Sequence, residues 1–267
     1  MLPRAALRST SAACIGRIDG FQGGTMLTRM SLLFALSAVA PVLPAAEVTQ
    51  IVTDLAYKAD EYPGSEYRRG VDQASAYVRE GRPSAAWNVL QPGMLYCDGK
   101  RNTETEIFYS VADKAEEREL RDRAPPGTTV TFVDWACPLT YKQAAFLAID
   151  TNEPERARAL LDRAEAIAPH WADVLAERAY LTGHQGDWPG ALALYRKAQA
   201  LAQRYSASAQ TRALILRGIG YALVEAGDLD GAAQAYRDSL KLDPDSEVGK
   251  KELQYIQERK AAADRSD

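Results

Sequence analysis

Small and bulky apolar residues recur at helical spacing through the C-terminal half of the chain. The pattern can be aligned on three alanines, Ala157, Ala191 and Ala232. Four positions after each alanine lies a bulky residue, which is Leu161, Tyr195 or Tyr236. Seven positions after each alanine lies a small residue, which is Ala164, Ala198 or Ser239. Another small residue, Ala145, Ala179 or Gly220, lies twelve positions before each alanine. Positions four and seven apart share one face of an α-helix, so the pattern predicts three hairpins of closely packed antiparallel helices.

Turn-forming residues separate the two helices of each predicted hairpin. The turns lie at 152–154, 186–189 and 227–230 and are rich in Gly, Pro, Asn and Asp. Asp187 and Asp228 are expected to cap the helices that follow, because an aspartate side chain accepts hydrogen bonds from the first backbone N–H groups of a helix. The sequence therefore predicts three repeats within residues 139–245, followed by a capping helix and tail at 246–267.

Weaker helical patterns occupy residues 47–91. Apolar residues at helical spacing predict one helix before a break at 62–65 and a second helix from about Glu66 to Glu80. A turn at 81–84 then leads into a short helical stretch at 85–90. We interpret residues 47–91 as N-terminal helices that form a degenerate copy of the repeat.

The helical period is lost between residues 92 and 138. Runs of β-branched and aromatic residues predict strands at 107–111 and 128–133, with a third strand at 94–97 and a charged helix at 115–124 between the first two. We interpret 92–138 as a small α+β insert. The segment from Asp134 to Pro138 is either a functional loop or, as the presence of Trp135 beside Cys137 favours, a packed one.

The repeats resemble the tetratricopeptide repeat (TPR), a helix-turn-helix unit of 34 residues. The key alanines are separated by 34 and 41 residues, and the extra residues fall near Gln203 to Gln210. The resemblance implies a mainly α fold, a TPR-type solenoid of helical hairpins that carries the α+β insert and ends in a capping helix. Pro154 and Arg178 depart from the usual repeat pattern and affect packing details rather than the fold.

The front of the chain resembles a secretory signal peptide. Arg29 precedes a short apolar run that ends in small residues near Ala45 and Ala46, and this run is too short to span a bilayer. We therefore expect residues 26–46 to be a signal peptide that starts at Met26 or Met30, and residues 1–25 to be a mis-called extension. A mitochondrial transit peptide and a lipoprotein site at Cys14 are the alternatives.

Charge and cysteine content narrow the functional classes. Loss of residues 1–46, which carry four arginines and one aspartate, changes the net charge from −4 to −7. An acidic chain without basic clusters is a poor nucleic-acid binder, and no stable membrane span is expected after cleavage of the signal. Cys97 and Cys137 then form an even pair, which in an exported protein predicts a disulfide; two buried thiols are the alternative. We expect a periplasmic or secreted bacterial protein.

The TPR resemblance implies that a peptide or protein partner binds along a concave face lined by the first helix of each hairpin. The residues that directly follow Ala145, Ala179 and Gly220 are all aromatic, and charged residues lie one helical turn away from them. The predicted binding residues are Lys142, Phe146, Tyr180, His184, Arg217 and Tyr221. An extended peptide with apolar and acidic side chains would suit this set. The alternative is that the aromatic rings pack inward.

No catalytic or cofactor motif is present in the sequence. It lacks His-Glu-x-x-His, Cys-x-x-Cys, a nucleophile elbow and a phosphate loop, so neither a metal nor another cofactor is expected. We expect His170 and His184 to be surface or cap residues. The sequence favours a non-enzymatic binding scaffold or adaptor over an accessory subunit of an envelope assembly or an enzyme with its site at 92–138.

Overall fold

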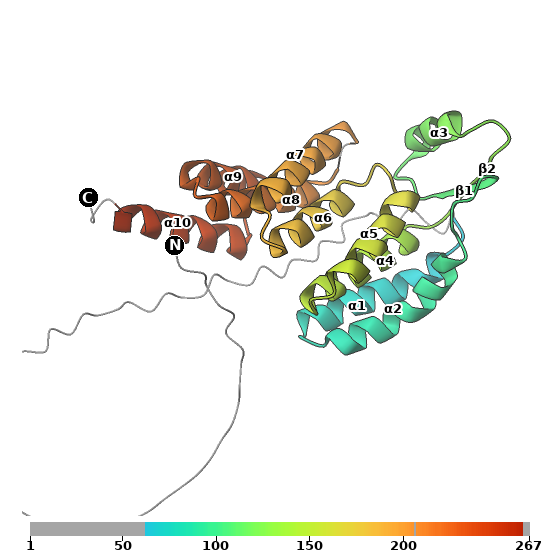
Figure 1. The fold of residues 1–267 in the computed structure, drawn as a ribbon, viewed down its shortest axis with the longest axis horizontal. Coiled ribbons are helices and arrows are strands. Elements are labelled where there is room, and N and C mark those ends of the chain that lie inside the picture. Colours follow the sequence, from blue (N-terminus) through green and yellow to red (C-terminus); the bar gives the residue numbers. More distant parts are fainter. Residues whose placement is uncertain (1–61, 206, 264–267) are drawn as a thin grey trace, which may run out of the picture. The chain divides into compact units, whose positions relative to one another are not determined.

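The computed structural model describes residues 62–205 and 207–263 (Figure 1). The predicted signal peptide, the extension before it and the helix expected before residue 60 lie outside the described residues. Among the described residues, no helix is both long and apolar enough to cross a membrane.

Pairs of consecutive helices form the repeating hairpins predicted by the sequence. The structure pairs α1 with α2, α4 with α5, α6 with α7 and α8 with α9, and α10 packs on α9 (Figure 1). The bounds of these helices are α1 Arg68–Arg79, α2 Pro83–Asp98, α4 Ala136–Asp150, α5 Pro154–Ile167, α6 Ala172–His184, α7 Trp188–Arg204, α8 Ala209–Ala226, α9 Leu229–Leu242 and α10 Glu247–Ala263. A short 3₁₀ turn, Ser65–Tyr67, precedes α1.

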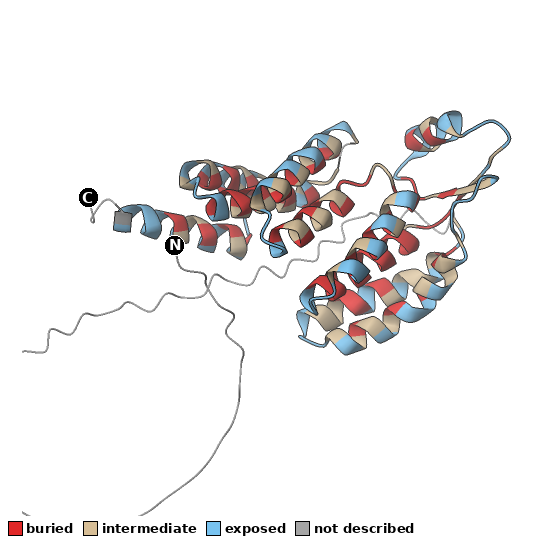
Figure 2. Ribbon diagram, viewed as in Figure 1, coloured by how far each residue is buried: buried red, intermediate tan, exposed pale blue. Residues whose placement is uncertain are grey.

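The small and bulky residues of the repeat form the seams between helices, which confirms the register. Ala157, Ala191 and Ala232 are all fully buried, and their bulky and small partners are buried with them. Buried positions, drawn in red, recur along the helices α4 to α9 (Figure 2). Gly220 of α8 lies against the ring of Tyr236, and a Cβ at this glycine would lie 2.7 Å from the ring. The small residues are therefore needed because bulky side chains from the neighbouring helix occupy the adjacent space.

The turns have the expected chemistry. The carboxylates of Asp187 and Asp228 accept hydrogen bonds of 2.9 Å from the backbone N–H groups of Gly190 and Gly231, so each caps the helix that follows. Gly227 ends α8 with a φ of 86°, a left-handed conformation that suits glycine. The cap is missing from the first repeat, where α5 starts without a side-chain cap.

Helix α2 is longer than the sequence pattern predicts. It continues through Pro92 to Asp98, so the boundary at residue 92 and the third strand at 94–97 were wrong. Leu90, Gly93 and Cys97 are buried on one side of the helix, and a Cβ at Gly93 would lie 3.0 Å from Thr140 Oγ1 of α4. This packing against α4 stabilises the last turns of α2, although Pro92 removes one backbone donor.

The insert contains two strands and one helix. Strands β1 (Glu106–Tyr109) and β2 (Thr129–Phe132) pair in parallel, with Glu106 opposite Thr129, and α3 (Lys114–Arg123) connects them. The two strands and the helix predicted between them are therefore confirmed within about two residues. The backbone N–H of Ser110 donates to the carbonyl of Ile167 at 2.8 Å, which fixes the insert to the end of α5.

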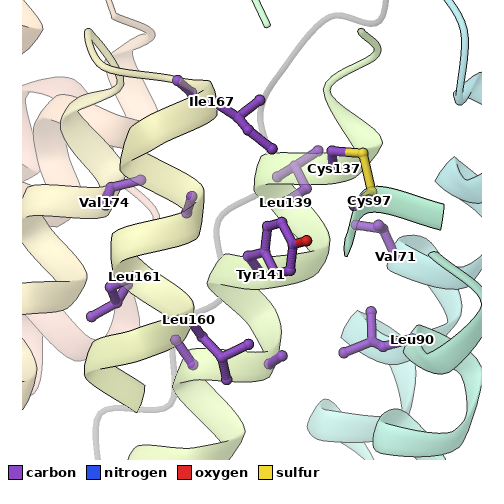
Figure 3. Close-up of a cluster of buried hydrophobic side chains, with 14 of the residues drawn as sticks. Val71, Leu90, Cys97, Cys137, Leu139, Tyr141, Leu160, Leu161, Ile167 and Val174 are labelled. Carbon is purple, nitrogen blue, oxygen red and sulfur yellow. A yellow bond between two sulfur atoms is a disulfide. The ribbon is translucent and has the colours of Figure 1, made fainter. Parts of the chain in front are cut away.

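A disulfide and a buried ion pair fix the base of the insert. Cys97 at the end of α2 is bonded to Cys137 in the first turn of α4, as predicted, and both are buried in the cluster shown in Figure 3. Nearby, Arg68 Nε donates to the buried carboxylate of Asp134 at 3.0 Å. The indole N–H of Trp135 donates to the Val111 carbonyl at 2.9 Å, so this segment is packed.

Candidate functional site

The aromatic residues of the predicted binding face come from equivalent positions on three first helices. Phe146 lies on α4, Tyr180 on α6 and Tyr221 on α8, and each directly follows a small seam residue. One residue along a helix rotates the side chain by about 100°, away from the seam. Phe146 is only 8% exposed, whereas Tyr180 and Tyr221 are half-buried. We refer to the exposed parts of α4, α6, α8 and α10 around these residues as the first-helix face.

Ring contacts divide the aromatic residues into two groups. Phe146 and Tyr180 stack with centroids 6.2 Å apart, and His184 Nε2 lies 3.0 Å from the Tyr180 hydroxyl. Farther along the chain, Trp188 meets Tyr221 edge to face with centroids 5.3 Å apart. Trp188 was missed in the sequence because it lies in the first turn of a second helix rather than on a first helix.

The two predicted cationic residues are buried and already paired. Lys142 is 6% exposed, and its Nζ lies 3.7 Å from the carboxylate of Asp173 on α6. Arg217 is 3% exposed, and Nη1 donates to Asp243 at 3.0 Å. The structure therefore places both residues behind the face as internal ion-pair partners rather than at its exposed edge.

Glu177 is a half-buried acidic residue that was not predicted from the sequence. It lies one helical turn after Asp173 on α6. Burial raises the pKa of Glu177 to about 7, the nearby Asp173 adds to this rise, and Lys142 opposes it. Burial likewise raises the pKa of Asp173, although Lys142 and the Thr211 hydroxyl favour its ionised form. The i, i+4 spacing of the two carboxylates was the available signal.

Two further carboxylates act electrostatically on Tyr221. Burial raises the pKa of Tyr221, and the carboxylates of Glu225 and Glu252 raise it further. Glu252 of α10 is 4% exposed, and burial followed by the charge of Glu225 raises the pKa of its carboxyl group. No local pattern in the sequence links these two glutamates, because 27 positions separate them.

A different polar cluster joins the insert to the repeats. His170 Nδ1 lies 3.2 Å from the Glu116 carboxylate, and the His170 ring stacks on Tyr205 with centroids 4.2 Å apart. The Tyr205 hydroxyl donates to Glu119 at 3.2 Å. Burial lowers the pKa of His170 and raises that of Glu116. His170 is thus a half-buried packing residue, not the surface or cap residue expected, whereas His184 is exposed at the end of α6.

Within residues 62–205 and 207–263, no group of three or more His, Cys, Asp or Glu residues is placed to hold a metal ion. The arrangement instead offers two kinds of noncovalent contact on the first-helix face. The rings of Tyr180, Tyr221 and Trp188 offer apolar and π surface, and the exposed Glu225, one helical turn after Tyr221 on α8, offers negative charge.

Comparisons with known proteins found several solved structures with partial similarity to the chain. No protein-family model and no curated protein matches the sequence. The N-terminal domain of stress-induced protein-1 from C. elegans is 20% identical, with a TM-score of 0.39, over 45% of this chain and 94% of that one. The Sgt2 TPR domain from Aspergillus fumigatus is 22% identical, with a TM-score of 0.41, over 48% and 82%. The structure of Pseudomonas aeruginosa pilF is 14% identical, with a TM-score of 0.48, over 76% of this chain and 74% of that one.

The TPR-type repeats of this chain are identified by its own packing. The key alanines, the bulky residues and the small residues of all three copies occupy the seams of consecutive helical hairpins. The fold is the mainly α hairpin architecture with a small α+β insert and a C-terminal helix that the resemblance implies.

Proposed function

We propose that the protein is a non-enzymatic scaffold that binds a peptide or protein partner on its first-helix face, in an extracytoplasmic compartment. The single observation that carries the proposal is the position of Tyr180 and Tyr221. Both are half-buried aromatic residues at the same register of successive first helices, outside the seams that hold the hairpins together. Partly exposed aromatic rings contribute strongly to protein recognition.

The buried residues of the predicted set support this face without contacting the ligand directly. Phe146 stacks on Tyr180, and Lys142 neutralises Asp173. Their replacement would disturb packing as well as binding. The informative substitutions are therefore Tyr180→Ala and Tyr221→Ala, which remove rings that reach the surface.

A binding experiment tests the proposal directly. Random dodecapeptides displayed on phage are selected on the immobilised chain from residue 47 onward, and selected peptides are measured by fluorescence anisotropy. We expect the Tyr180→Ala/Tyr221→Ala variant to bind at least about tenfold more weakly. Unchanged binding would overturn the assignment of the face.

Tyr109→Ala supplies the matched control. Tyr109 is a half-buried tyrosine on β1 of the insert. We expect the Tyr109→Ala variant to bind the selected peptides with unchanged affinity. Circular dichroism checks that all variants are folded. A loss of binding in this variant alone would assign the partner contact to the insert instead.

The extracytoplasmic location is supported by the apolar leader in the sequence and by the Cys97–Cys137 disulfide, since disulfides persist in oxidising compartments. Mass spectrometry of the protein recovered from a bacterial host tests it. We expect a mature N-terminus close to residue 46 or 47 and a periplasmic or secreted fraction. An intact Met1 in the cytoplasm would contradict the proposal.

A further inference from the structure

The second helices of the three repeats differ in their charged residues. Helices α5 and α9 carry both signs of charge, and they form ion pairs within the helix, such as Arg158 with Glu155 and Lys241 with Asp238. Helix α7 contains no Asp or Glu and three cations, which are Arg196, Lys197 and Arg204. The middle repeat therefore presents charge of a single sign where its neighbours present a mixture.

The excess of cations extends from α7 into α8. Residues 188–224 contain five Lys and Arg residues and no Asp or Glu, although the whole chain has a net charge of −4. Four of the five are exposed, and these are Arg196, Lys197, Arg204 and Arg212. Within residues 62–205 and 207–263, no ion pair involves Arg196, Lys197 or Arg212. Arg204 Nη2 lies 3.7 Å from Glu119 Oε1, a long surface contact that contributes little, so these cations are accessible to a ligand.

Helix geometry gathers three of the cations on one side of α7. Successive residues of an α-helix are rotated by about 100°, so Arg196, Lys197 and Arg204 fall within an arc of about 100°. Ala193 and Ala200 fall inside the same arc and are exposed, so no bulky side chain separates the cations. Exposed positions, drawn pale blue, recur along α7 (Figure 2). The buried residues lie on the opposite side of the helix, and these are Ala191, Tyr195, Ala198 and Ala202. We refer to the exposed side as the α7 face.

We propose that the α7 face binds an acidic segment of a partner protein, whose carboxylates pair with Arg196, Lys197 and Arg204. Exposed charges of a single sign attract and orient a ligand of the opposite sign, and arginine pairs with carboxylates in a fixed geometry. A nucleic acid fits less well, because the chain as a whole is acidic and repels a polyanion.

The α7 face is separate from the first-helix face, so this inference does not depend on the proposed function. It also gives a different position for the acidic ligand that the sequence pattern suggested. On the first-helix face, Lys142 and Arg217 are buried in internal ion pairs, and a ligand carboxylate would have to displace an aspartate to reach them. On the α7 face no such displacement is needed.

A matched pair of labelled peptides tests the proposal. The acidic probe is an alanine-based helical peptide with glutamates one turn apart along one face, and the neutral probe has glutamine at the same positions. Fluorescence anisotropy measures the binding of each probe to the protein. We expect the acidic probe to bind and the neutral probe not to bind. The Arg196→Glu/Lys197→Glu variant should bind the acidic probe at least about tenfold more weakly, and added salt should weaken binding to the native protein.

Arg237→Glu/Lys241→Glu is the matched control. Both residues are exposed on α9, another second helix, and the variant has the same change in net charge. We expect it to lower the affinity for the acidic probe by less than about twofold, because solvent and salt screen charges on a different helix. Circular dichroism checks that both variants are folded. An equal loss of affinity in the two variants, or no binding of the acidic probe, would overturn the proposal.

Two further probes and one further variant identify the partner and the face. Single-stranded DNA and phosphatidylglycerol vesicles are measured in the same way. If either binds more tightly than the acidic probe and loses binding in Arg196→Glu/Lys197→Glu, the acidic protein segment is overturned in favour of a nucleic acid or a lipid surface. Tyr180→Ala/Tyr221→Ala should leave binding of the acidic probe unchanged. A loss of this binding would assign the acidic probe to the first-helix face and overturn the α7 face.

Discussion

The C-terminal hairpins and the N-terminal part of the molecule are stabilised by different means. In α6–α10, tyrosine rings lie over small residues at repeated positions, as Tyr195 does over Gly218 and Tyr236 over Gly220. In α1–α5 and the insert, individual links dominate, including the Cys97–Cys137 disulfide and the Arg68–Asp134 ion pair. Packing that is repeated from one hairpin to the next produces a repeating pattern in the sequence, whereas a single disulfide or ion pair does not.

Removal of one seam tyrosine should give the largest effect. Tyr236 is 1% exposed, and Tyr236→Ala is expected to lower the free energy of unfolding by about 3 to 5 kcal/mol, because it leaves a cavity over Gly220. Urea unfolding followed by circular dichroism measures the loss, and hydrogen exchange should rise in α8–α10 more than in α1–α4. An equal rise in hydrogen exchange in all helices of the Tyr236→Ala variant would show that the N-terminal part and the C-terminal hairpins unfold as one unit.

Loss of the disulfide should give the converse pattern. The double variant Cys97→Ala/Cys137→Ala is expected to lower the free energy of unfolding by about 2 to 4 kcal/mol. The reason is that the unfolded chain is no longer constrained by a cross-link between two residues 40 positions apart. The increase in hydrogen exchange should be concentrated in α1, α2 and the insert. Reduction of the native protein serves as the control and should reproduce the loss. A melting temperature unaffected by reductant would contradict this role.

A pH-dependent effect is expected at Glu177, where the two parts meet through Lys142 of α4 and Asp173 of α6. Its pKa is raised from 4.5 to about 7 in the folded protein, so its stabilising contribution is complete below pH 4.5 and is lost as the pH rises through about 7. Glu177→Gln should therefore be more stable than the native protein by about 1 to 2 kcal/mol at pH 8 and nearly equal to it at pH 4.

Thermal unfolding of both proteins across this pH range measures the difference. Glu258→Gln, which removes an exposed carboxylate, is the control and should follow the native curve. A stability difference at Glu177→Gln that stays constant from pH 4 to pH 8 would exclude the ionisation of this residue as the cause.

The smallest effects are expected at the helix starts. Asp187→Ala and Asp228→Ala each remove a capping hydrogen bond and should lower the free energy of unfolding by about 1 kcal/mol. In the N-terminal part, α5 begins after Glu153 without a side-chain cap, so Glu153→Asp is expected to raise stability by about 0.5 kcal/mol. Urea titration resolves both changes. A loss at Glu153→Asp would show that the uncapped start is required by its surroundings.

The sequence predicted the repeated features well and the individual ones incompletely. The seam residues, the Asp caps, the two strands and the disulfide partners were all correct, because each has a local pattern or a compositional signature. The end of α2 was missed because its continuation through Pro92 depends on packing against α4, which no local rule describes.

The predicted binding residues show the same division. The sequence identified the aromatic register of Phe146, Tyr180 and Tyr221, which follows from helix geometry. It could not identify the partners of Lys142 and Arg217, because Asp173 and Asp243 lie 31 and 26 positions away and approach only in the folded chain. Trp188 was missed for the same reason, since it reaches Tyr221 of α8 from α7.

The disulfide at the base of the insert also determines how the chain carries mechanical load. Cys97 and Cys137 join the end of α2 directly to the start of α4, so the residues between them form a covalent side loop. A pulling force applied to the two ends of the chain passes through the sulfur atoms and leaves β1, α3 and β2 without tension. A protease cut within this loop likewise leaves the helices on either side covalently joined until a reductant separates them.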